Sequence, residues 1–286
     1  MKNNLPTFIG IGAGKSGTTW LYSILNQHCE ICMSSAKETL FFEDYYDRGF
    51  NWYSSFFKEC NRHKAIGEIS NTYIFSSLVP ARIYEFNPTT QLIATLRNPV
   101  DRAFSHYLFH YRNAQIEGSF EEAITQYPDL IERGLYFHYL SNYLEYFKRE
   151  QILILLFDDL KNNPVTLARK IFNFLGVDPE WATPELVQTK RLPASKPRSK
   201  GLAKIVKGVA LMMRQSGLPQ AITAITKIKN SPIVDLLYTP YSPNEYPQMA
   251  CETREKLNDY FRDDIKKLSQ LVERDLESLW LHSSNE

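Results

Sequence analysis

Near its N-terminus the chain carries Thr7-Phe-Ile-Gly-Ile-Gly-Ala-Gly-Lys-Ser-Gly-Thr-Thr19, its most informative stretch for the fold. An apolar run ends in glycine at Gly12, and apolar residues recur at helical spacing from Thr18 to Leu25. The pattern predicts a strand, a tight loop and a helix in a P-loop-like arrangement. The backbone N–H groups of such a loop and the helix N-terminus can bind a phosphate, and Lys15 adds a full positive charge.

Three further apolar runs follow this unit along the chain, and a helical pattern comes after each. They are Ala65 to Ile69, Gln91 to Leu96 and Gln151 to Phe157. Asn98 is the expected N-cap of one of these helices, with Pro99 in its first position. Alternating apolar strands and helices predict an α/β fold with a central, mostly parallel sheet flanked by helices. Ligands of such sheets bind beyond the carboxyl ends of the strands.

Length and composition favour one folded domain. The 286 residues are 43% hydrophobic and 23% charged, which excludes collagen-like and disordered classes. We expect a single domain over residues 1–286, with an α/β core over 6–175 and a mainly helical part over 176–286. The clearest helical patterns are Pro164 to Leu175 and Cys251 to Leu279.

The charge is balanced overall but unevenly distributed. Thirty-three basic and 32 acidic residues give a net charge of +1, so no general affinity for nucleic acid is expected. Between Glu185 and Asp235 there is no acid and there are ten cations, which leaves 23 basic against 32 acidic residues elsewhere, a net of −9. Such a segment meets an anion or forms a solvated basic face. The ten are Lys190, Arg191, Lys196, Arg198, Lys200, Lys204, Lys207, Arg214, Lys227 and Lys229.

The cysteines bear on location. Four cysteines are too few for a disulfide framework, and Cys29 with Cys32 lacks the second pair of a zinc site, so ordinary buried thiols are expected. Neither a signal peptide nor a membrane span is evident near the N-terminus. These features predict a cytoplasmic protein.

Three families of phosphate-binding loop compete for the glycine-rich stretch, and spacing separates them. A Walker A loop would need glycine at position 9, where Ile9 stands. A dinucleotide fingerprint matches Gly12, Gly14 and Gly17, but the acid about 20 residues on, Glu38, follows a polar stretch instead of ending an apolar strand. The remaining pattern is K-[ST]-G-T-T.

With this pattern the chain resembles the sulfotransferases that use 3′-phosphoadenosine 5′-phosphosulfate (PAPS). The resemblance implies that the 5′-phosphosulfate is bound by Lys15, Ser16, Gly17, Thr18 and Thr19. The same family binds the 3′-phosphate with an Arg at a strand end and a Ser eight residues later, which implies Arg97 and Ser105. A guanidinium offers a planar fork to a phosphate, and two helical turns place the serine on the same side.

The segment Ala36 to Phe57 resembles heparan-type carbohydrate sulfotransferases, with K-E-x-x-F-F followed by W-Y-x-x-F-F. The resemblance implies that Glu38 is the catalytic base, with Lys15 stabilising the leaving group; the alternative is a lone surface Glu. Leu40 departs from the pattern, because many of those enzymes have His there, and we expect a polar contact near the base to be missing. Lys37 is a weaker candidate for assistance by charge.

Three further motifs extend the resemblance to about residues 6 to 281. Glu68 follows the family's G-E-x-[ST] pattern and could orient Lys15 or substrate, or cap a helix. Asp158 and Asp159 fit a helix N-cap better than a Walker B pair. The stretch Ser195 to Gly201 resembles the loop that folds over the cofactor, which implies contacts from Arg198, Ser199, Lys200 and Gly201.

The function predicted from these motifs is in-line transfer of a sulfuryl group from PAPS to an acceptor hydroxyl in a sugar, lipid or carrier-bound acyl chain, with no metal required. An amine acceptor is less favoured. The alternatives are a magnesium-dependent P-loop kinase and a non-catalytic nucleotide-binding protein. The closing segment, Arg254 to Leu279, resembles the terminal helix common to bacterial members of the family. The basic, apolar segment 200–229 could cover an apolar substrate, contact a membrane, bind an acidic carrier protein or simply pack.

Overall fold

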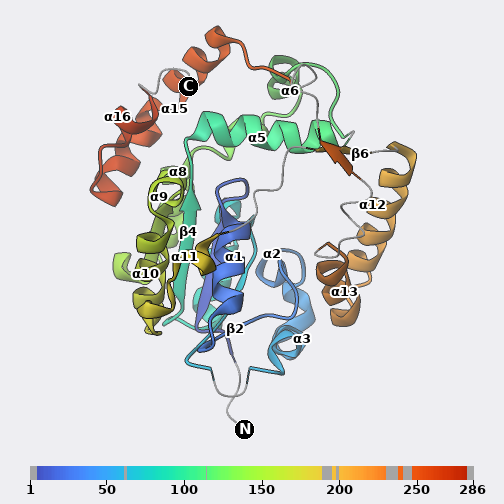
Figure 1. Ribbon diagram of the computed structural model, residues 1–286, viewed down its shortest axis with the longest axis vertical. Coiled ribbons are helices and arrows are strands. Elements are labelled where there is room, and N and C mark those ends of the chain that lie inside the picture. Colours follow the sequence, from blue (N-terminus) through green and yellow to red (C-terminus); the bar gives the residue numbers. More distant parts are fainter. Residues whose placement is uncertain are drawn as a thin grey trace.

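The computed structural model describes residues 5–60, 63–113, 115–188, 195–197, 200–229, 238–240 and 247–281. Its centre is a parallel sheet of five strands in the order β2-β3-β1-β4-β5 (Figure 1). All residues of the central strand are buried, as expected for a sheet covered on both faces. The predicted α/β fold is confirmed. The strands are β1 (Phe8–Gly12), β2 (Ile31–Met33), β3 (Ala65–Ile69), β4 (Gln91–Leu96) and β5 (Ile152–Leu156).

Helices cover both faces of the sheet, and the alternation of side chains along the strands divides the core between them. Phe8 and Ile93 pack with α1 (Thr18–Gln27) and α10 (Pro164–Leu175) on one face. Ile9 and Leu92 pack on the other face with α4 (Val79–Phe86), α5 (Pro99–Arg112), α8 (Tyr136–Leu144) and α15 (Cys251–Val272). Shorter helices connect these elements: α2 (Phe41–Asp44), α3 (Gly49–Ser54), α6 (Phe120–Gln126), α7 (Asp129–Glu132), α9 (Phe157–Asn162), α11 (Pro184–Val187) and α16 (Leu276–Trp280).

Helix and strand boundaries agree with the prediction where neighbouring residues in the sequence determine them. The Asn98 side chain caps α5 by accepting the N–H groups of Val100 and Asp101, with Pro99 in the first position. The long C-terminal helix differs from expectation, because it is broken into α15 and α16 at Glu273, which has a φ of 54°. Strand β2 was not predicted, because three residues give too short a pattern.

The predicted N-cap role of Asp158 and Asp159 is wrong. Helix α9 is capped by Leu156 without a side-chain hydrogen bond, and both acids lie in its first turn. Asp158 accepts a hydrogen bond from the indole of Trp280, and Asp159 pairs with Arg274 at 2.7 Å. The two acids therefore attach the C-terminal segment to α9, the helix that follows β5.

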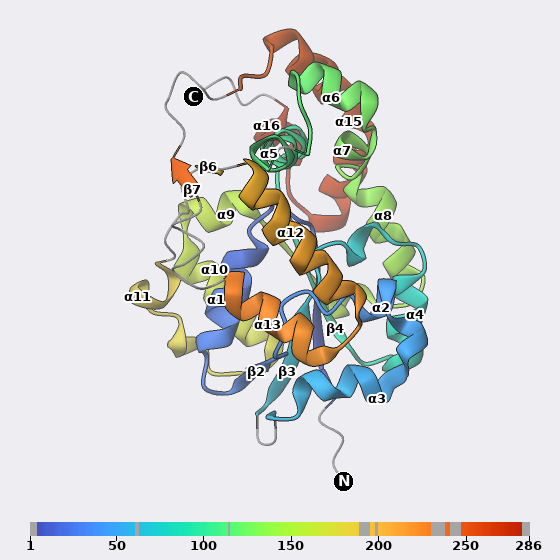
Figure 2. The same cartoon turned by 90° about the vertical axis from the view of Figure 1, so that its right-hand side faces the viewer.

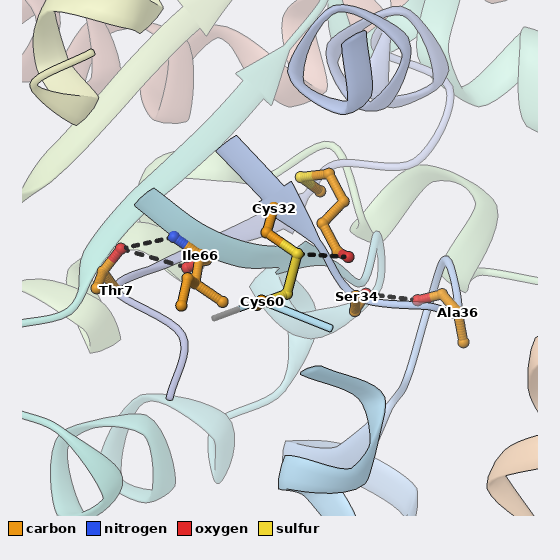
Figure 3. The surroundings of a disulfide bond; sticks show 7 residues. Thr7, Cys32, Ser34, Ala36, Cys60 and Ile66 are labelled. Carbon is orange, nitrogen blue, oxygen red and sulfur yellow. Dashed lines mark hydrogen bonds between the residues drawn. A yellow bond between two sulfur atoms is a disulfide. The ribbon is translucent and has the colours of Figure 1, made fainter. Parts of the chain in front are cut away.

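A disulfide joins Cys32 on β2 to Cys60, with a Cα–Cα distance of 5.5 Å (Figure 3). The expectation of ordinary buried thiols is therefore wrong for this pair, and the free Cys29 and Cys251 are exposed. Spacing does not show the pair, because 28 positions separate the partners and only the sheet brings them together. The predicted cytoplasmic location loses the support that free thiols gave it.

The C-terminal part is mainly helical and includes α12 (Lys200–Gln215) and α13 (Pro219–Lys229), which lie outside the sheet layers (Figure 1). A small antiparallel pair is formed by β6 (Ser195–Pro197) and β7 (Tyr238–Pro240). Among the described residues, none of the helices combines the length and the apolar character needed to cross a membrane.

Candidate functional site

The candidate site lies where the carboxyl ends of four strands meet. The strand order changes direction between β1 and β4, because β2 and β3 lie on one side of β1 and β4 with β5 on the other. Crevices at such switch points are the usual ligand sites of open α/β sheets. The loop after β1 and the Arg97 segment after β4 flank this point, and the segments after β2 and β3 carry Glu38 and Asn71.

Two glycines shape the loop after β1. Gly12 has a φ of 124°, and a Cβ there would lie 2.5 Å from the backbone oxygen of Asn71, so only glycine fits. Gly17 is the left-handed N-cap of α1, with a φ of 98°. The loop is held by hydrogen bonds from Ala13 N to Thr95 O at 2.8 Å and from Gly14 N to Asn71 O at 3.1 Å. The first turn of α1 has N–H groups without helical acceptors, which suits an anion.

Lys15 stands among other cations at this loop. Burial, and then the charges of Arg112, Arg97 and Lys37, lower the pKa of Lys15 to about 8. Its ammonium lies 4.5 Å from the centre of the Phe109 ring, and the Arg112 guanidinium lies 5.4 Å from the same centre. A polyanion bound here would offset the repulsion that lowers this pKa.

Arg97 lies at the end of β4, as the strand-end motif predicts. Its guanidinium stacks 4.9 Å from the centre of the Phe157 ring and lies 3.9 Å from Asp101. The Nε atom of Arg97 is buried without a hydrogen-bond partner in the described part of the chain. Buried polar atoms usually have partners, so this atom fits a site that an anionic ligand completes. Ser105 lies half-buried on α5, one turn beyond Asp101.

Glu38 lies on the turn after β2 and is held by contacts from two other elements. Its carboxylate accepts a hydrogen bond from Asn71 Nδ2 at 2.7 Å and lies 3.9 Å from the Arg214 guanidinium, which also donates to the Glu38 carbonyl at 3.2 Å. Its own N–H donates to Ile69 O at 3.0 Å. Leu40 has no polar side-chain group to offer the base, and Asn71 and Arg214 provide polar contacts to Glu38 from other elements.

Glu68 lies fully buried beneath this turn and accepts four hydroxyl hydrogen bonds. Its donors are Thr39 at 2.6 Å, Ser70 at 2.9 Å, Tyr53 at 2.9 Å and Tyr73 at 3.1 Å. Burial raises the pKa of the Glu68 carboxyl, and the four donors oppose that shift. A carboxylate is the one side chain here that can accept all four.

Three of these hydroxyls also cap the helix that follows the base. Ser70, Thr39 and Tyr73 accept the backbone N–H groups of residues 40, 41 and 42, at distances of 3.1, 3.3 and 3.1 Å. Each hydroxyl therefore accepts a helix-terminal N–H and donates its own proton to Glu68. The suggested capping role of Glu68 is realised through these hydroxyls, and its described hydrogen bonds do not include Lys15.

The structure thus brings Lys15, Ser16 and Arg97 to one region, with Thr18 buried at the start of α1. Thr19 is exposed and accepts a hydrogen bond from Lys37 at 3.1 Å. Of the predicted covering loop, Arg198 and Ser199 lie outside the described residues, and Lys200 and Gly201 begin α12.

Three residues of the site were missed from the sequence. Arg112 had a local signal, because it stands seven positions after Ser105 and so on the same face of α5. Asn71 directly follows the G-E-x-[ST] pattern of residues 67–70, which does not include it. Arg214 had no signal, since it is 176 positions from Glu38.

Comparisons with known proteins agree on one family. A family described as sulfotransferase domain matches residues 6–216. The crystal structure of a sulfotransferase from Alicyclobacillus acidocaldarius is similar, with a TM-score of 0.69 and 25% identity over 97% of this chain and 99% of that one.

Two curated relatives match over different parts of the chain. Bifunctional heparan sulfate N-deacetylase/N-sulfotransferase 4 of Mus musculus is 29% identical over 95% of this chain and 30% of that protein. Membrane-associated sulfotransferase kil1 of Dictyostelium discoideum is 35% identical over 51% of this chain and 33% of that protein. The matched regions thus span about a third of the length of these relatives.

Proposed function

Since the chain belongs to the sulfotransferase family, we propose that it transfers the sulfuryl group of PAPS to an acceptor hydroxyl, with Glu38 as the base and Lys15 at the leaving group. Membership makes the chain a PAPS-dependent sulfotransferase enzyme. The P-loop kinase has no comparable support, and Ile9 occupies the position where a Walker loop needs glycine. The roles of single residues and the acceptor are the proposal.

The cation cluster fits a nucleotide with phosphates at both ends. We assign the 5′-phosphosulfate to the loop around Lys15 and Ser16, and the 3′-phosphate to Arg97 with Ser105. The orphaned Nε atom of Arg97 supports this assignment, because it is buried and would gain a partner. Arg112 joins the set, since its charge acts on Lys15 more strongly than that of Arg97 or Lys37.

The chemistry of the chain's own groups follows from these positions. Glu38 takes the proton of the acceptor hydroxyl as the new oxygen–sulfur bond forms, a contribution of about 10²–10⁴-fold in rate. Lys15 stabilises the negative charge that develops on the bridging oxygen as the old sulfur–oxygen bond breaks. Asn71 and Arg214 hold the Glu38 carboxylate, so the base does not have to be ordered during the reaction.

A glycan is the acceptor that the comparisons favour. Relatives matching 95% of this chain carry names that refer to heparan sulfate, and the segment around Glu38 resembles the heparan-type enzymes. Lipid and carrier-bound acceptors are the competing classes.

Calorimetric titration with 3′-phosphoadenosine 5′-phosphate (PAP), compared with ADP and with and without magnesium, tests the nucleotide assignment. We expect tight PAP binding that is independent of magnesium and that weakens at least tenfold in Arg97→Ala. Arg169→Ala is the matched control, because Arg169 pairs with Glu180 on the surface. ADP binding alone, or binding only with magnesium, would overturn the proposal. PAP binding without sulfuryl transfer to any hydroxyl or amine in an acceptor screen would indicate a non-catalytic protein.

A further inference from the structure

Exposed aliphatic side chains gather on one helix of the molecule. Val206, Val209, Leu211 and Met212 of α12 are 38, 51, 55 and 71% exposed, and Leu218 just beyond it is 57% exposed. In the part of the chain that the structure describes, the other exposed large hydrophobic residues are aromatic, with the exception of Leu78. Contiguous apolar exposure of this kind marks an interaction surface.

The opposite side of α12 is fixed to the catalytic core. Arg214 lies half-buried against Glu38, and its carbonyl accepts a hydrogen bond from Tyr45 at 2.7 Å. The carbonyl of Gly217 accepts one from the Trp52 indole at 2.6 Å. Ile222 of the following helix is 1% exposed in the main core. Of these contacts, those of Arg214 orient α12 itself, and helical spacing places Val209 and Met212 on the side of the helix away from Arg214. Figure 2 shows the helix crossing the face of the molecule nearest the viewer.

We propose that the outward face of α12 binds in the plane of a bilayer that contains anionic lipids. Its aliphatic side chains enter the boundary between headgroups and acyl chains, as in other interfacial amphipathic helices. The segment 190–229 carries ten cations and no acid; Arg214 is held at Glu38, and each of the others that lies near an anionic surface adds attraction. The remaining chain has a net charge of −9 and is repelled, so the same field orients the molecule with α12 toward the lipid.

A protein partner fits this face less well. Binding hot spots at protein interfaces are enriched in Trp, Tyr and Arg, whereas α12 contains no aromatic residue. A second copy of this chain would bring two strongly cationic segments together, which is repulsive. The docking proposal does not depend on the proposed sulfuryl transfer, because it concerns the outer face of the helix.

Flotation of the full chain with vesicles tests the proposal. We expect binding to vesicles of phosphatidylcholine mixed with phosphatidylglycerol that is at least about tenfold tighter than binding to phosphatidylcholine alone, and that falls at high salt. Val209→Glu/Met212→Glu places two charges on the outward face and should lower the partition coefficient at least about tenfold. Its circular dichroism and PAP affinity should match those of the unmodified protein.

Leu78→Glu is the matched control, because Leu78 is 60% exposed on a different element, and it should leave flotation unchanged. Equal binding to neutral and anionic vesicles, absence of binding, or an equal loss in Leu78→Glu would overturn the proposal. Light scattering tests whether a second copy of the chain binds this face instead. A dimer that the double substitution dissociates would overturn the membrane proposal and assign the face to self-association.

Discussion

Around Lys15 the chain gathers three further cations, whereas it surrounds the carboxylates of Glu38 and Glu68 with hydrogen-bond donors. On the cationic side, burial and neighbouring charges lower the pKa of Lys15 to about 8, and Arg97 Nε is buried without a partner in the described chain. On the acidic side, Glu68 accepts four hydroxyls, and Glu38 is held by Asn71 and Arg214.

The difference shows how one site divides two tasks. The nucleotide half gathers like charges whose repulsion a polyanionic ligand would offset, which costs stability in the free protein and strengthens binding. The base half is already satisfied by the fold, so its geometry does not wait for substrate. Substitutions should therefore act in opposite directions on stability: removing a cation from the first half relieves repulsion, and removing an acid from the second half leaves donors without an acceptor.

The largest effect on activity is expected from Glu38→Gln. The amide keeps the size of the side chain and can still accept from Asn71, but it cannot take the acceptor proton, so kcat should fall by about 10²–10⁴-fold. PAP affinity should stay within about twofold of the unmodified protein, because the nucleotide half is untouched. Steady-state kinetics with PAPS and calorimetry with PAP measure the two quantities.

Glu43→Gln is the control for this change. Glu43 stands on the same segment and accepts a hydrogen bond from Thr72, so the variant alters an acid near the base without altering the base. Activity close to normal is expected. Retention of full kcat in Glu38→Gln would assign proton removal to another group.

Lys15→Ala should lower kcat by about 10²–10³-fold, the usual cost of removing one charge-stabilising donor from a transition state. Its thermal midpoint at pH 7 should equal or exceed that of the unmodified protein, because Lys15 is protonated below its pKa of about 8 and is repelled by its neighbours. Lys170→Ala, on the exposed side of α10, should change neither quantity. A marked loss of stability in Lys15→Ala would contradict the account of the cationic half.

Much of the fold followed from short-range patterns. Strands at Ala65–Ile69 and Gln91–Leu96 and the helix Pro164–Leu175 have the predicted boundaries, because apolar runs and helical spacing reflect burial directly. Strand β2 was not predicted, because three residues are too few to show an alternating pattern. The break at Glu273 was not predicted either, because the residue with the left-handed backbone there is not a glycine.

The site was likewise predictable only where its residues belong to local motifs. Lys15 and Arg97 stand at fixed positions in such motifs, so the sequence alone identified them. The contact between Arg214 and Glu38 joins positions 176 apart, and the disulfide joins positions 28 apart, so packing rather than local pattern creates both. The hydroxyl shell of Glu68 likewise comes from three separate segments. Sequence motifs indicated which groups bind the nucleotide, but the groups that hold the base depend on tertiary structure.

The affinity for PAP should depend on pH, because burial and the neighbouring cations lower the pKa of Lys15. The pKa of Lys15 is about 8 in the free protein, and bound phosphates would raise it, so binding above pH 8 takes up a proton. Affinity should then fall by up to about tenfold per pH unit above pH 8. Calorimetry in buffers of different ionisation enthalpy measures the proton uptake.

The same shift has a defined sign for stability. Between pH 8 and the ordinary value of 10.5, the unfolded chain keeps the Lys15 proton that the folded chain has lost, so this group makes the free protein more stable as pH rises. Lys15→Ala should abolish both pH effects. PAP affinity and proton uptake that do not vary across this range would show that the cations do not interact as described.

Glu68→Gln should give the smallest change in turnover and the clearest test of the acidic half. The amide can accept from two hydroxyls but presents hydrogens to the others, so the caps of residues 40–42 loosen and the turn carrying Glu38 shifts. We expect kcat to fall about three- to tenfold, KM for PAPS to stay unchanged and stability to drop by about 1–3 kcal/mol. Tyr53→Phe is the matched control, because Tyr53 donates to Glu68 but caps none of these N–H groups in the described structure. Tyr53→Phe should lose stability while keeping kcat. An equal loss of kcat in both variants would mean that Glu68 stabilises the core without positioning Glu38.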